Sequence, residues 1–238
     1  MSDTCKVAIV AALEREIWPL VKDWSFSDKE HDGHRFRFYE QGSMVLVCGG
    51  IGAEAARRAA QAVICLYHPD LVVSAGFAGA LDSTLRVGDI LIPRHVVDAG
   101  DGSRAEHSHG EGVLLTISQV AGPEQKAKLS NAFGADVVDM EAAAVARCAE
   151  AHGVKFLACK VVSDASDTSM LSLMSFVGGD GRFHVGRFLL HIAMRPWLWG
   201  KVWRIARDTA AASARLSAAL VGTDVLQHAP SERQLTAQ

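Results

Sequence analysis

The chain has 238 residues, of which 49% are hydrophobic and 21% are charged. This balance is typical of a folded globular protein, and the length suits one large domain or two small ones. The formal net charge of −3 gives no electrostatic reason to expect nucleic acid as a partner, although the stretch between Arg182 and Arg207 is locally basic. Uncharged apolar runs all fall short of the roughly 18 residues that a membrane-spanning helix needs.

The cysteines indicate a reducing compartment. Five of them are scattered along the chain, and none stands in Cys-x-x-Cys spacing. An odd and unclustered set argues against both a disulfide framework and a zinc site, so we expect a cytoplasmic protein. The first apolar run is short and is followed at once by Glu14 and Glu16, which is unlike a signal peptide.

Short β-branched apolar runs alternate with alanine-rich stretches along most of the chain, and this predicts alternating strands and helices. Pro19 is expected to interrupt or cap the first helix. The polar, glycine-rich residues 101–112 are expected to form a surface loop. In chain order the predicted elements are strand 7–13, helix 14–21, two strands in 35–50, helix 50–68, strand 71–81 ending in a glycine-rich turn, one or two strands in 87–100, strand 113–120, helix 123–133, strand 135–140, helix 141–153, strand 155–164 and mostly helix over 169–220.

Strand–helix alternation with near-continuous apolar strands predicts an α/β fold, in which helices cover both faces of a mainly parallel or mixed sheet. We expect a single domain over 1–222 that includes an apolar and basic helical insertion at 169–209. The polar tail 223–238 is expected to be disordered. Ligands of such folds bind at the carboxyl ends of strands.

Three acids follow predicted buried strands directly: Glu16, Glu141 and Asp164. Each one alone is explained as a first-turn or N-cap residue of a helix. Together, at the edge of the sheet where ligands bind, they predict an acidic site. The glycines of the turn GFAG at 76–79 would let a ligand approach the backbone there.

The glycine-rich segments GGIG (49–52) and AGFAG (75–79) have no lysine or arginine close by, and GGIGAE lacks the full spacing of a dinucleotide fingerprint. His107 and His109 lie in the polar loop without the spacing of metal ligands. We therefore expect neither a metal nor a cofactor. Separated carboxylates suit hydrolysis at a sugar, where one activates water, one binds hydroxyl groups and one acts as general acid.

Five stretches resemble the purine nucleoside phosphorylase and nucleosidase superfamily, especially the methylthioadenosine/S-adenosylhomocysteine nucleosidases. They are VAIVAALEREI, VCGGIGAEAA, VVSAGFAGAL, VVDMEAAAVA and KVVSDASD, and in the family's order they span residue 5 to about 167. The resemblance implies a three-layer α/β/α sandwich with a central mixed sheet, and a homodimer.

The resemblance also implies roles. Glu16 would activate the attacking water, Glu141 would hold the ribose hydroxyls, and Asp164 would donate a proton to purine N7. For that last role Asp164 must hold its proton near neutral pH, which partial burial would favour. Asp139, beside the ribose clamp, is expected to be structural. The implied substrate-binding residues are Phe77, Ala78, Gly79, Gln119, Val120, Ala121, Met140, Glu141 and Ser163.

Water is the expected nucleophile. Phosphorylases of this superfamily carry an arginine just after the first strand, where this chain has Leu-Glu-Arg-Glu, and a carboxylate there would repel phosphate. Arg15 is adjacent to Glu16 but is expected to point elsewhere on the helix. Phe77 stands where the nucleosidases usually have serine, which weakens a phosphate site further. Phosphorolysis remains the alternative reaction.

The segment 169–209 is rich in large apolar residues interleaved with arginines. In this superfamily the region after the catalytic aspartate borders the 5′ pocket of the nucleoside, so the resemblance implies a pocket for a bulky hydrophobic 5′-substituent. The alternative is that these residues make core and dimer contacts. The run GVLLTISQVAGPEQKAKLSNAFGADVVDMEAAAVA with a later RPWLWGK resembles hopanoid-associated members, which convert adenosylhopane to ribosylhopane and adenine. We therefore expect a nucleoside substrate, lipid-linked in this case, and peripheral membrane contact through 182–207. The alternatives are a methylthioadenosine/S-adenosylhomocysteine nucleosidase and a non-catalytic nucleoside- or lipid-binding protein.

Overall fold

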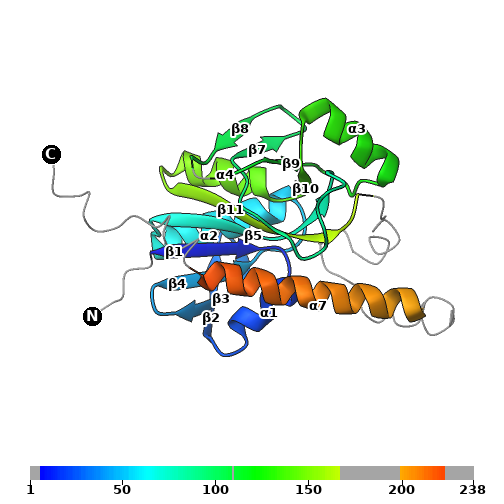
Figure 1. Ribbon diagram of the computed structural model, residues 1–238. Helices are drawn as coiled ribbons and strands as arrows, with labels where there is room; N and C mark the ends of the chain where they lie inside the picture. The colour runs from blue at the N-terminus through cyan, green and yellow to red at the C-terminus, as the bar shows by residue number, and fades with distance from the viewer. Residues whose placement is uncertain (1–5, 109, 167–198, 223–238) are drawn as a thin grey trace.

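The computed structural model describes residues 6–108, 110–166 and 199–222, which form a mixed β-sheet with helices on both faces (Figure 1). The expected three-layer α/β architecture is confirmed. The strands are β1 (Val7–Ala11), β2 (Ser25–His31), β3 (His34–Gln41), β4 (Met44–Cys48), β5 (Leu71–Ala80), β6 (Ile90–Leu91), β7 (His95–Asp98), β8 (Arg104–Glu106), β9 (Val113–Thr116), β10 (Val137–Asp139) and β11 (Lys155–Asp164). The helices are α1 (Glu14–Val21), α2 (Ala53–Tyr67), α3 (Pro123–Phe133), α4 (Ala142–Ala151) and α7 (Trp199–Val221).

Strand β5 organises the sheet because three strands pair with it. β1 and β11 run parallel to β5, and β11 follows it over almost its whole length. β10 runs antiparallel to the end of β5, with Val138 opposite Gly79. The carboxyl end of β10 therefore points back along β5, toward the ends of β1 and β11. This antiparallel pairing brings the carboxyl ends of β1, β10 and β11 together beside β5.

Two apolar layers account for the near-continuous apolar strands. On one face, Ile9 and other residues of β1, β5 and β11 pack against α1 and α7. On the other face, Ala8 and Val10 pack with α2 and α4. Because successive side chains of a strand alternate between the faces, a strand covered on both sides needs apolar residues throughout. The alanines of α2 and α4, such as Ala59 and Ala149, are fully buried and let these helices approach the sheet closely.

Pro19 lies inside α1 rather than at its end, so the expectation that it interrupts or caps the helix is wrong. Proline has no backbone N–H, so the carbonyl of Arg15 lacks its usual helical donor. The hydroxyl of Ser213 on α7 lies 3.2 Å from that carbonyl oxygen and 2.9 Å from that of Glu16. Ser213 thus supplies a donor where Pro19 removes one and ties α7 to the segment that carries Glu16.

Three further expectations needed correction. β5 continues through Gly76–Gly79 to Ala80, so these residues are strand and not a turn. β8 lies within 101–112, where a loop was expected, and pairs with β7. β9 ends at Thr116, earlier than predicted, and β2 was not predicted at all. Every residue of β2 except Phe26 is polar, so the strand lacks the apolar run that marked the other strands.

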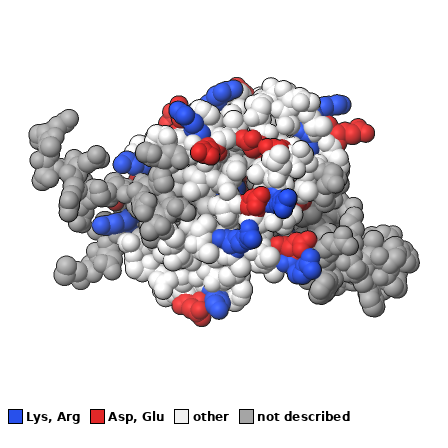
Figure 2. Space-filling view, in the orientation of Figure 1, with Lys and Arg blue, Asp and Glu red and all other residues white. Residues whose placement is uncertain are grey.

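On the face shown in Figure 2, lysine and arginine side chains are interspersed with aspartate and glutamate over the described surface. None of the helices in the described ranges combines the length and apolarity that a membrane crossing requires. The predictions about the apolar insertion, the tail 223–238 and His109 fall largely or wholly outside the described residues; of the insertion, the described part is the start of α7.

Candidate active site

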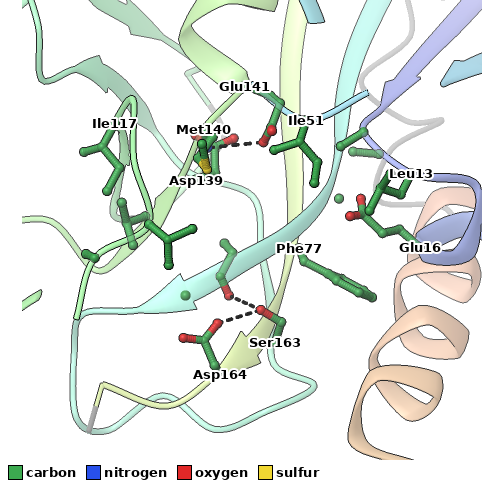
Figure 3. A pocket seen from close by; sticks show the side chains of 18 of the residues that line it. Leu13, Glu16, Ile51, Phe77, Ile117, Asp139, Met140, Glu141, Ser163 and Asp164 are labelled. Atoms are coloured by element: carbon green, nitrogen blue, oxygen red, sulfur yellow. Dashed lines mark hydrogen bonds between the residues drawn. The ribbon is translucent and has the colours of Figure 1, made fainter. Parts of the chain in front are cut away.

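A cavity of about 160 Å³ opens where β1, β10 and β11 end beside β5 (Figure 3). Gln119 is the one predicted site residue that does not line it; its side chain is exposed, because β9 ends before it. The structure thus brings together Glu16 and Asp164, which lie 148 positions apart in the sequence. The predicted residues that line the cavity are Glu16, Phe77, Ala78, Gly79, Val120, Ala121, Met140, Glu141, Ser163 and Asp164.

Glu16 enters the cavity from the first turn of α1 and is 6% exposed. Its Oε2 atom is buried and has no hydrogen-bond donor among the described residues. Burial, and then the charge of Glu141, raise the pKa of Glu16 to about 8, although Lys160 and Arg15 oppose the shift. A Cβ atom at Gly76 would lie 2.8 Å from Oε2, so only glycine at this position lets the carboxylate approach β5 so closely.

Glu141 stands at the N-cap of α4, on another side of the cavity (Figure 3). Its Oε1 accepts a hydrogen bond of 2.8 Å from the backbone N–H of Gly52, and its Oε2 accepts one of 3.2 Å from that of Met140. Burial and the neighbouring Asp139 nevertheless raise the pKa of Glu141 above its usual range. Two backbone donors fix the orientation of this carboxylate, as a group that must bind hydroxyls in one geometry requires.

A buried network lies beneath Glu16 and Glu141. Lys160 Nζ is 2.9 Å from Asp139 Oδ2 and donates to Ser74 Oγ at 3.1 Å. Asp139 also accepts hydrogen bonds from Thr116 Oγ1 at 2.6 Å and from the backbone N–H of Ala142 at 2.9 Å. Both oxygens of Asp139 thus have partners within the fold, as a structural role would require.

The ammonium of Lys160 is the positive charge of this network. Burial by itself lowers the pKa of Lys160, but Asp139 and Glu141 outweigh that effect and raise it. Lys160 in turn lowers the pKa of Glu16 and of Glu141. One buried cation thus lies among three carboxylates, and its lowering effect on the pKa of Glu16 and of Glu141 is smaller than the raising effect of their burial.

Asp164 ends β11 on a third side of the cavity and is 8% exposed. Its Oδ1 accepts a hydrogen bond of 2.8 Å from Ser163 Oγ, and its Oδ2 lies 2.5 Å from Lys126 Nζ. A Cβ atom at Gly79 would come within 3.2 Å of the Asp164 carboxylate and 3.4 Å of Lys126 Cε. The second glycine of β5 thus leaves room for this ion pair, as the first does for Glu16.

Comparison with known proteins agrees with this arrangement. A family model described as the phosphorylase superfamily matches residues 6–115 and 108–177, which together make up most of the chain. The chain belongs to the phosphorylase superfamily.

Nucleosidases are among the proteins to which this superfamily member is similar. A 5′-methylthioadenosine/S-adenosylhomocysteine nucleosidase of Staphylococcus epidermidis is 26% identical, over 68% of this chain and 87% of the relative. The adenine complex of such a nucleosidase from Colwellia psychrerythraea is 25% identical and superposes with a TM-score of 0.62, over 69% of this chain and 85% of that one. Futalosine hydrolase of Helicobacter pylori, at 19% identity, a TM-score of 0.65 and coverage of 90% and 96%, shares the fold.

Two lysines of this phosphorylase-superfamily site escaped prediction. Lys160 stands inside the apolar run of β11, and a lysine there is almost never buried without a partner. Lys126 lies on α3 three and seven residues before Leu129 and Phe133, which pack into an apolar cluster. Its position on the same helical face as these buried residues was the pattern from which a buried Lys126 could have been predicted.

Arg15 requires a correction. Its side chain was expected to point elsewhere, but Arg15 lines the cavity of this phosphorylase-superfamily member, and its charge lowers the pKa of Glu16. The residue is exposed, so it lies toward the mouth of the cavity rather than beneath it. Consecutive residues of an α-helix are rotated by about 100° around the helix axis. At the first turn of α1, this rotation lets the side chains of both Arg15 and Glu16 reach the same cavity.

Proposed function

We propose that this protein is a nucleosidase, which hydrolyses the N-glycosidic bond of a purine nucleoside. The observation that carries the proposal is the placement of Glu16, Glu141 and Asp164 on three sides of one cavity (Figure 3). Each carboxylate is held differently: one has an unpaired oxygen, one is oriented by backbone donors, and one is tied to a lysine. Three different environments suit three different tasks.

In this proposal, the ribose lies against Met140 and Glu141, whose carboxylate accepts hydrogen bonds from the 2′- and 3′-hydroxyls. The base lies toward Val120, Ala121 and Asp164, where purine N7 receives a proton. The purine then leaves as a neutral molecule, while positive charge develops on the sugar. Carboxylates on the sugar's side of the cavity stabilise that charge.

Glu16 activates the water that attacks the anomeric carbon. Its unpaired Oε2 is free of protein donors within the described chain and is therefore able to accept a hydrogen bond from water. With a pKa of about 8, the carboxyl group is largely protonated at neutral pH, and the basic form grows as the pH rises. In its ionised, active form Glu16 would repel a phosphate ion at the same place, which disfavours phosphorolysis despite Arg15 at the rim.

We expect base release that does not depend on phosphate. Free purine should form from an adenine nucleoside at the same rate in phosphate-free buffer and in the same buffer with added phosphate, and ribose should carry a free 1-hydroxyl group. Chromatography of the sugar product separates this from a ribose 1-phosphate. A strict requirement for phosphate would make the protein a phosphorylase, and no base release under either condition would favour a non-catalytic binding protein.

We further propose that the nucleoside carries a bulky hydrophobic 5′-substituent, with adenosylhopane as substrate and ribosylhopane and adenine as products. Leu13, Ile51 and Phe77 give the Glu16 side of the cavity an apolar wall (Figure 3). The apolar and basic segment 169–209 begins a few residues after Asp164. A homodimer and peripheral membrane contact through 182–207 belong to this proposal. The second candidate is a methylthioadenosine/S-adenosylhomocysteine nucleosidase, which the 26% identity to that relative favours.

A series of 5′-alkylthioadenosines tests the two candidates. If the 5′-group enters an apolar pocket, kcat/KM should rise about fourfold with each added methylene from methyl to octyl, because burying one methylene contributes about 0.8 kcal/mol. Adenosine itself is the reference substrate. If the methyl compound is turned over as fast as the longer ones and adenosylhopane is no better, the lipid assignment fails and the second candidate takes its place.

A further inference from the structure

Lys126 is a buried lysine in the wall of the cavity, and the mechanism above gives it no task. Its residue exposure is 2%, and it reaches the site from α3. Its Nζ atom donates to Asp164 Oδ2 at 2.5 Å and to the backbone carbonyl of Ala165 at 2.8 Å. The ammonium group therefore sits directly against the carboxyl group that is assigned to protonate the purine.

This contact conflicts with a simple acid role for Asp164. The ammonium group of Lys126 has donors only, so Asp164 Oδ2 accepts in this contact. Ser163 donates to the other oxygen, so both oxygens accept hydrogen bonds. An ionised carboxylate has no proton to give and acts as an acceptor only. For the acid role that the sequence implies, Asp164 therefore needs a neighbouring group that supplies a proton.

We propose that Lys126 is the source of the proton that reaches purine N7, and that Asp164 passes it on. As the bond between C1′ and N9 breaks, its electron pair goes to the purine. The Lys126 ammonium loses a proton to Asp164 Oδ2, and Asp164 gives a proton to N7. Glu16 takes a proton from the water that adds to C1′. The total charge is unchanged, and the next cycle begins when Glu16 returns its proton to solvent and Lys126 regains one. This proposal rests on the proposed nucleosidase function.

Stability alone is a poor explanation for a buried lysine–aspartate pair. The cost of removing both charges from water offsets most of their attraction, so apolar residues of the same size would serve the fold as well. Lysine also differs from arginine in a way that matters here. A lysine can give up its proton, whereas an arginine stays charged in proteins. Replacing the lysine with arginine therefore keeps the positive charge and removes the supply of a proton.

Lys126→Arg and Lys126→Met separate these roles, with Lys128→Met, an exposed residue of the same helix, as the control. Lys126→Arg keeps a cation beside Asp164 but supplies no proton, so kcat for the purine nucleoside should fall roughly 100-fold or more across the whole pH range. In Lys126→Met, Asp164 must take its proton from solvent. At high pH, the kcat of Lys126→Met relative to that of the unmodified protein should be about as low as that of Lys126→Arg. As the pH falls, this relative kcat should recover.

A second substrate shows whether the site is intact. A 4-nitrophenyl riboside with the same 5′-substituent has a leaving group that departs without protonation. Both Lys126 variants should hydrolyse it within about threefold of the unmodified protein, well below the roughly 100-fold that loss of an acid costs. Asp164→Asn should behave like Lys126→Arg with both substrates, because it breaks the same proton path at the next step.

Several results would overturn the proposal. Purine release by Lys126→Arg at the unmodified rate would show that a cation beside Asp164 is enough. A pH-independent activity ratio for Lys126→Met would show that proton supply is not what was lost. Equal losses on both substrates would assign Lys126 to the architecture of the site. If the unmodified protein hydrolyses neither substrate, the nucleosidase function itself fails, which is a separate outcome.

Discussion

Replacing Glu16 with Gln should abolish hydrolysis while making the folded protein more stable at alkaline pH. Glutamine has the size of glutamate but cannot accept a proton from water, so kcat/KM should fall roughly 100-fold to 10,000-fold, the usual contribution of a general base. For the unmodified protein, kcat/KM should rise with pH up to about pH 8, because the pKa of Glu16 is about 8 and only the carboxylate is active. Rates from pH 6 to 9.5 check both expectations.

The stability effect follows from the same pKa. Burial raises the pKa of Glu16 from 4.5 to about 8, so between these values the folded protein holds a proton that the unfolded chain has lost. The free energy of unfolding is therefore higher at low pH, and it decreases progressively as the pH rises from 4.5 toward 8. Glutamine has no charge to bury. Since each pKa unit corresponds to about 1.4 kcal/mol, Glu16→Gln should exceed the unmodified protein by several kcal/mol at pH 9 and match it near pH 4.5.

Urea unfolding at these two pH values measures the difference. Glu14→Gln is the matched control, since Glu14 is exposed on the same helical turn and the change removes the same charge. It should leave kcat/KM and the pH dependence of unfolding as they are. If Glu16→Gln is no more stable than the unmodified protein at pH 9, Glu16 is not a destabilised buried acid. If the variant keeps its activity, Glu16 is not the base.

A residue of the site could be predicted from the sequence where a local sequence pattern marks it, but not where its position depends on tertiary contacts. Glu16, Glu141 and Asp164 each follow an apolar strand, and the rule that ligands bind at strand ends placed them together. The exact meeting point depended on β10 running antiparallel to β5, which no local pattern specifies. Gln119 lies outside the cavity lining for a similar reason: β9 ends three residues before it, and no local pattern marks that end.

The lysines illustrate a different limit. Asp139 and Lys160 lie 21 residues apart in the sequence, and Lys126 and Asp164 lie 38 apart. A lysine in an apolar segment signals that a partner exists but not which acid it is. The partner is set by the register of β11 against β5 and by the docking of α3, both of which are tertiary. Sequence patterns thus pointed to the acids that line the cavity but not to the two lysines beside them.

Lys160 is the residue whose loss should destabilise the fold most among the site's charges. Its side chain is 2% exposed and Asp139 has no exposed side-chain surface, so Lys160→Met would leave an uncompensated carboxylate beneath the cavity. Removing one partner of a buried ion pair typically costs about 3–5 kcal/mol. We expect a loss of this size in the free energy of urea unfolding at pH 7. Lys155→Met, an exposed position on the same strand, should have little effect.

The double variant Lys160→Met with Asp139→Asn distinguishes a charge effect from a packing effect. If the unpaired charge causes the loss, removing that charge should recover much of the stability, and the two changes should be far from additive. Additive losses would instead mean that the lysine's aliphatic chain is what matters. The single variant should also move the rise of kcat/KM to higher pH, because Lys160 normally lowers the pKa of Glu16. A stable Lys160→Met protein with an unshifted pH profile would remove Lys160 from this account.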